Sequence, residues 1–111
     1  MRFKIPFNDN KQFCIVHVAD NVRSFKRRNK CHAYYIAADV RKLRSGLFGH
    51  IHLSEFNLSP MAHELVAHEV QHMMIDWILC RAGGALTKRN KEKIAAMTGE
   101  ITRRIWRKIA V

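Results

Sequence analysis

The pattern of apolar and polar residues predicts three β-strands in the first half of the chain. FCIVHV (13–18) is a short apolar run rich in β-branched residues, and CHAYYIAADV (31–40) combines aromatic with small residues. HIHLSEF (50–56) alternates apolar and polar residues with a period of two, which is typical of a strand with one face in the core. RKLRSGLFG (41–49) predicts a basic loop. We therefore expect a short three-stranded sheet.

A long helix is predicted to follow the third strand. The segment NLSPMAHELVAHEVQHMMIDWILCR (57–81) places Ser59 as the helix N-cap and Pro60 at the first helical position. Gly83 and Gly84 favour termination of this helix. Such a long apolar helix is expected to supply much of the core.

Two further helices are predicted. ADNVRSFKRRN (19–29) is polar and basic and favours a short helix capped by Asp20 or Asn21. The last helix is expected to begin after Thr87 or Asn90, because apolar residues then recur at three- and four-residue spacing. This stripe consists of Ile94, Met97, Ile101, Ile105 and Ile109. The chain of 111 residues is therefore predicted to be a single small α+β domain over 1–111.

The middle of the chain differs from the rest in its charged residues. The net charge is +11, yet residues 47–80 contain no Lys or Arg, four carboxylates and five of the seven histidines. A segment without fixed cations that is rich in imidazole and carboxylate groups favours a divalent metal. The alternative is that a buried strand and helix simply exclude charged residues.

HEVQH (68–72) is the strongest candidate for metal chemistry. On a helix, His68 and His72 lie about 40° apart around the axis and one turn apart along it, so both imidazoles can bind one Zn²⁺. Glu69 is rotated by about 100° from His68 and would flank that metal. We expect the histidine side of the helix to be buried as well as the opposite side. The alternative is two core histidines hydrogen-bonded to their neighbours.

A third ligand is expected from the last helix, where Glu92 and Glu100 are the available carboxylates. The residues one or two turns beyond Glu92 are small, namely Ala95, Ala96 and Gly99. A face of small residues would allow this helix to approach the HEVQH helix closely and bring Glu92 to the metal. Glu92 is therefore favoured over Glu100.

HEVQH followed after nineteen residues by EKIAAMTG resembles the active-site core of the gluzincins, the zinc metallopeptidases with an HExxH helix and a downstream glutamate. The resemblance covers residues 50 to about 105 and implies a zincin-like fold with His68, His72 and Glu92 as zinc ligands and Glu69 as general base. HIHLSEF is similar to the edge strand that zincins use to hold an extended peptide. Ala96 replaces an acid that supports a ligand histidine in thermolysin-like enzymes, and Asp76 is one candidate for that role.

The function expected from these residues is hydrolysis of peptide or protein substrates with one zinc ion per chain. The rival hypothesis is a metal-stabilised basic module that binds nucleic acid or an acidic protein without hydrolysis. The absence of a long apolar segment and of a CxxC pair leads us to expect a cytoplasmic protein without a membrane contact. His50 and His52 share one strand face and are either surface residues or substrate contacts.

Overall fold

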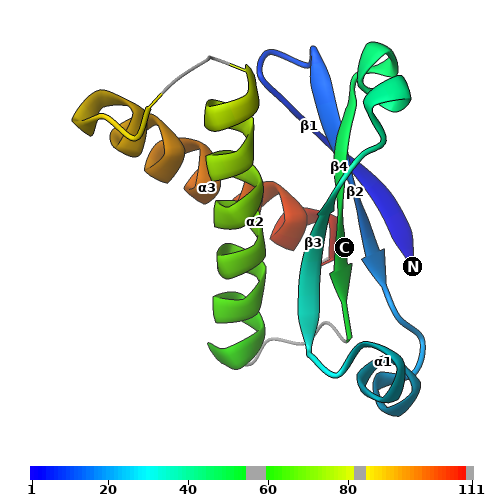
Figure 1. Ribbon diagram of the computed structural model, residues 1–111. Helices are drawn as coiled ribbons and strands as arrows, with labels where there is room; N and C mark the ends of the chain where they lie inside the picture. The colour runs from blue at the N-terminus through cyan, green and yellow to red at the C-terminus, as the bar shows by residue number, and fades with distance from the viewer. Residues whose placement is uncertain (55–59, 82–84, 110–111) are drawn as a thin grey trace.

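The computed structural model describes residues 1–54, 60–81 and 85–109. Within these residues the chain forms a small α+β domain with four strands and three α-helices (Figure 1). The strands are β1 (Arg2–Phe7), β2 (Gln12–Val18), β3 (Ala33–Ala37) and β4 (Leu47–Leu53). The helices are α1 (Val22–Asn29), α2 (Pro60–Arg81) and α3 (Lys88–Ile109), with a short 3₁₀ helix, η1 (Val40–Ser45), before β4.

The sheet is mixed and has the strand order β1-β2-β4-β3. β2 pairs antiparallel with β1 and parallel with β4, and β3 pairs antiparallel with β4. The prediction of three strands is therefore wrong: β1 (RFKIPF) is a fourth strand, in which Phe3, Ile5 and Phe7 face the core and alternate with two cations and a proline. As an edge strand, β1 can accommodate both the charges and the proline.

The central position of β4 corrects a second expectation. HIHLSEF was expected at the sheet edge, but β4 is paired on both sides, and the edges of the described sheet are β1 and β3. A strand hydrogen-bonded to two neighbours has no backbone groups left for a peptide substrate. Residues 41–49 are also more ordered than the predicted basic loop, since they contain η1 and the start of β4.

The core lies between one face of the sheet and the two long helices (Figure 1). Trp77 of α2 joins the layers, because its ring packs edge-on against Phe7 and its Nε1 donates a 2.7 Å hydrogen bond to the Gln12 side chain. Ile101 and Ile105 of α3 are fully buried in the same core. The predicted apolar stripe of the last helix is thus confirmed as its packing face at Ile94, Met97, Ile101 and Ile105.

The helix starts follow the predicted capping residues. Asn21 caps α1, since its side chain accepts a 3.0 Å hydrogen bond from the Ser24 amide. Thr87 Oγ1 accepts a 3.2 Å hydrogen bond from the Asn90 amide at the start of α3. α2 begins at Pro60 as predicted. The predicted cap Ser59 and the stop at residues 83–84 lie outside the described residues.

Gly49 and Gly99 provide a matched test of the packing. A Cβ atom added at Gly49 would lie 2.6 Å from Tyr35 Cε1 and 3.0 Å from the Ile36 carbonyl oxygen, whereas one added at Gly99 meets no atom within 4 Å. We expect Gly49→Ala to lower the free energy of unfolding by about 1–3 kcal/mol through overpacking of β3 against β4. Gly99→Ala should raise it by about 0.5–1 kcal/mol, because alanine favours the helix. Urea denaturation of both variants measures this, and equal effects would contradict the described packing.

Candidate functional site

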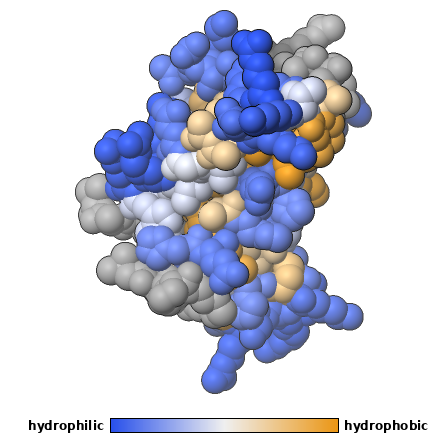
Figure 2. Space-filling model, turned by 90° about the vertical axis from the view of Figure 1, so that its left-hand side faces the viewer, coloured by the Kyte–Doolittle hydropathy of each residue, from blue (hydrophilic) through white to orange (hydrophobic). Residues whose placement is uncertain are grey.

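His68 and His72 lie side by side on α2, as predicted. Their Nε2 atoms are 3.0 Å apart, and the two rings are nearly perpendicular with centroids 4.5 Å apart. Both side chains are exposed, and Leu79 on the same side of the helix is 47% exposed. Leu65 and Ile75 on this side are half-buried against the core. The expected burial of the histidine side is therefore wrong at the histidines themselves, and so is the alternative of two core histidines. Figure 2 shows this helical side of the molecule, where the surface is mostly hydrophilic with smaller hydrophobic areas.

The reason for this exposure is that α2 packs mainly through one side. Val66, Val70 and Met73 are buried against the sheet and α3. The histidines occupy the side of the helix that these contacts leave open to solvent. A metal at the pair would therefore be reached directly from outside.

Glu69 has a different environment from the two histidines. Its side chain is only 7% exposed, and it lines a pocket together with His72, Tyr34 and Tyr35. Asp76 follows His72 by four residues on α2, and its carboxylate accepts a 2.7 Å hydrogen bond from the Tyr35 hydroxyl. The pocket thus lies between α2 and the edge strand β3, with an acidic side chain in its wall.

Glu92 does not join the histidine pair in this structure. Glu92, Ala95, Ala96 and Gly99 are all exposed on α3, and no atom would contact a Cβ at Gly99. The expectation that these small residues pack closely on the HEVQH helix is therefore wrong, because α3 packs through its isoleucines instead. Across the described His, Cys, Asp and Glu side chains, none completes a set of three around His68 and His72 with ligand atoms within 4.8 Å.

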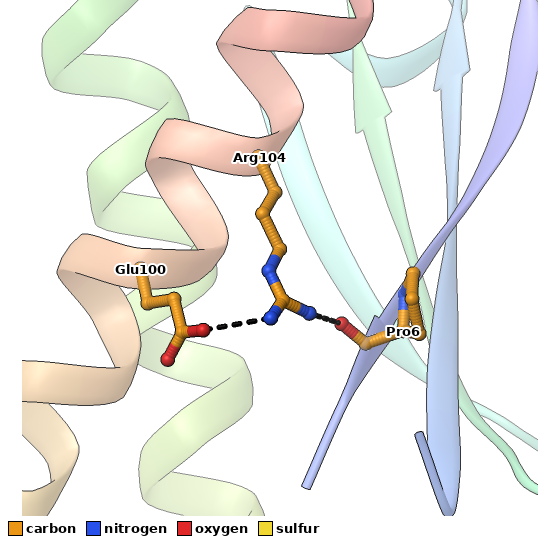
Figure 3. Close-up of polar contacts among 3 residues, drawn as sticks. All are labelled: Pro6, Glu100 and Arg104. Atoms are coloured by element: carbon orange, nitrogen blue, oxygen red, sulfur yellow. Dashed lines mark hydrogen bonds and ion pairs between the residues drawn. The ribbon is translucent and has the colours of Figure 1, made fainter. Parts of the chain in front are cut away.

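Glu100, the other candidate for the third ligand, is held near β1 (Figure 3). Arg104 donates a 2.7 Å hydrogen bond to the Glu100 carboxylate and a 2.6 Å hydrogen bond to the Pro6 carbonyl. The guanidinium group thereby connects α3 to the edge of the sheet. Glu100 therefore has a structural role that requires no metal.

A second histidine cluster lies on the sheet and includes a residue that the sequence analysis missed. His17 of β2 faces His52 of β4 as its register partner, and His50 is two residues earlier on β4. His17 Nε2 and His50 Nδ1 are 3.0 Å apart, and the potential ligand atoms of all three residues lie within 4.8 Å of one another. The sequence around His17, FCIVHV, predicts a strand but does not indicate which histidines lie beside it on β4.

Burial and mutual repulsion disfavour protonation of this cluster. Desolvation, followed by the nearby His52, His50, Arg2 and the N-terminal amine, lowers the pKa of His17 from its ordinary value of 6.5 to about 4. Burial, with Arg2, also lowers the pKa of His50, and burial, with His50, lowers that of His52. The three imidazoles are therefore uncharged at neutral pH and keep nitrogen lone pairs for a ligand.

The cluster continues into a row of stacked rings across the sheet. His17 stacks on His52 with centroids 4.3 Å apart, and His52 stacks on Tyr34 at 4.6 Å. Phe25 of α1 packs on Tyr34 at 5.9 Å. Because these rings cover one another's faces, they do not offer the open faces on which nucleic-acid bases stack.

No protein-family model matches the chain, and the searches of curated proteins and of solved structures likewise give no significant match. Among the described helices, none combines the length and the apolar character needed to span a membrane.

The low pKa of His17 predicts a pH-dependent stability in the metal-free protein. Because the unfolded chain binds protons near pH 6.5 and folded His17 only near pH 4, the free energy of unfolding should fall as the pH decreases between these values. His17→Asn should weaken this dependence, whereas His32→Asn, outside the cluster, should keep most of it. Urea denaturation in the presence of a chelator at several pH values measures the slope. If the free energy of unfolding of His17→Asn depended on pH as strongly as that of wild type, the low pKa of His17 would be contradicted.

Proposed function

We propose that this protein is a zinc-dependent peptidase with α2 as its active-site helix. The observation that carries the proposal is the convergence of His68 and His72, whose Nε2 atoms lie 3.0 Å apart beside the pocket that contains Glu69. Two imidazole nitrogens bound to one tetrahedral Zn²⁺ lie about 3.3 Å apart, since each Zn–N bond is about 2.0–2.1 Å. The pair therefore fits two corners of a zinc site without rearrangement of the helix.

Bound zinc would supply Lewis acidity and lower the pKa of water toward about 7. The role proposed for Glu69 is that of the general base, which accepts a proton from the attacking water and then delivers it to the leaving amine. Its carboxylate suits this role because it is buried and yet borders the pocket beside His72. A base shielded from bulk water keeps its proton available for the leaving group.

The proposed position of the substrate is the β3 edge. β3 is hydrogen-bonded to β4 on one side, and its Tyr34 and Tyr35 line the pocket with Glu69. An extended peptide could add to the other side of β3 as a further strand, with its backbone held near the pocket. The strand proposed to bind the peptide is thus β3, in place of the segment 50–56 that the sequence indicated.

The third ligand proposed from the family resemblance is Glu92. Since Glu92 is exposed and separate from the pair in this structure, binding would require a different arrangement of α3 from the one described. A zinc site with two protein ligands would be weak, so metal content reports on this assignment directly.

Replacement of the proposed base tests the activity. Glu69→Gln should lower kcat for cleavage of a quenched fluorescent peptide library by about 10²- to 10⁴-fold while zinc binding is retained. Glu64→Gln, an exposed glutamate on the same helix, is the matched control and should retain full activity. Equal activity of Glu69→Gln and wild type would refute the mechanism. Zinc binding that depends on His72, without hydrolysis in wild type, would favour the rival basic binding module.

Metal content tests the ligands separately. His72→Ala should lose one equivalent of zinc, measured by plasma mass spectrometry on protein purified without an affinity tag. Glu92→Ala should lose the same equivalent if the resemblance assigns the third ligand correctly. His63→Ala, an exposed histidine on the same helix, should lose none. Retention of zinc in Glu92→Ala but not in His72→Ala would show that a residue other than Glu92 supplies the third ligand.

A further inference from the structure

We propose that His17, His50 and His52 form a second metal site, on the face of the sheet opposite α2 and α3, for a late first-row divalent ion such as Zn²⁺. This site shares no residue with HEVQH and does not depend on the proposed peptidase activity. The inference rests on the placement of three imidazoles by two adjacent strands.

The strand register creates the cluster. Val16 and Ile51 are register partners and are fully buried toward the helices. Because side chains alternate along a strand, the next partners, His17 and His52, point to the other face of the sheet. His50 lies on that face as well, two residues before His52. The cluster and the α2 pair are therefore separated by the thickness of the sheet.

The distances fit a shared ion. The potential ligand atoms of the three rings lie within 4.8 Å of one another, and the closest pair, His17 Nε2 and His50 Nδ1, are 3.0 Å apart. Binding would require the parallel His17 and His52 rings to rotate about their side-chain bonds so that their nitrogens converge. All three rings are half-buried, so the strands already restrict their movement.

The donor set selects the kind of metal. Imidazole nitrogens suit Zn²⁺, Cu²⁺, Ni²⁺ and Co²⁺, whereas Mg²⁺ and Ca²⁺ require oxygen ligands. Arg2 and the N-terminal amine add positive potential near His17, which further disfavours ions held mainly by charge. Coordinate bonds to neutral nitrogens must therefore supply the affinity.

The surroundings leave room for a fourth ligand. A pocket lined by His17, His52, Tyr34, Arg28 and Asn29, among others, opens beside the cluster. Three histidines with an open position are typical of zinc sites that bind water or an exchangeable ligand. Arg28 in the pocket wall would favour an anion at that position.

The test uses the full chain with His68→Ala and His72→Ala, which removes the α2 pair. We expect this protein to bind one equivalent of Co²⁺ with the visible absorption of a tetrahedral site, and to bind Zn²⁺ in competition. Addition of His17→Ala or His52→Ala should weaken Zn²⁺ binding at least about 100-fold, beyond the effect of losing a supporting contact. His32→Ala, a half-buried histidine outside the cluster, is the matched control and should leave the affinity unchanged.

A second measurement avoids any loss of folding in these variants. In the same background with the cluster intact, Zn²⁺ should shift the ring nitrogen resonances of His17, His50 and His52 in NMR spectra, and leave those of His32 in place. Absence of metal binding, or binding that survives both His17→Ala and His52→Ala, would overturn the proposal. Because the α2 pair is absent from this background, either result is independent of whether HEVQH supports hydrolysis.

Discussion

The parallel pairing of β2 with β4 is the constraint on which both candidate sites depend. It places β4 in the middle of the described sheet and leaves β3 at an edge, next to α2. The same pairing brings His17 opposite His52, although 35 residues separate them in the chain. Parallel neighbours need a crossover connection, and here the chain passes through α1, β3 and η1 before β4 returns beside β2.

The helices show how one-sided packing decides which residues are available for chemistry. α3 buries Ile94, Ile101 and Ile105 and exposes the side that carries Glu92. α2 buries Val66, Val70 and Met73, and this leaves His68 and His72 in solvent. The hydrophobic effect acts on the largest apolar side chains, so alanines and glycine do not compete with isoleucines for the packing face.

The histidine-rich segment without fixed cations spans β4 and α2, and the fold divides it between two places. His50 and His52 lie on the outer face of the sheet, whereas His68 and His72 lie on the helical side. A single pattern of charge along the sequence thus becomes two separate clusters of imidazole. In both clusters the nearest ring nitrogens are 3.0 Å apart.

The features that could be predicted from the sequence are those that depend on near neighbours along the chain. Contacts within a few residues set the start of α2 at Pro60 and the adjacency of His68 and His72. They also narrowed the helix caps to two candidates each, of which the structure uses Asn21 and Thr87. The central place of β4, the exposure of Glu92 and the grouping of His17 with His50 and His52 arise only in the folded chain. These depend on pairing and packing between distant segments, and local alternation or spacing carries no information about which distant segment is the partner.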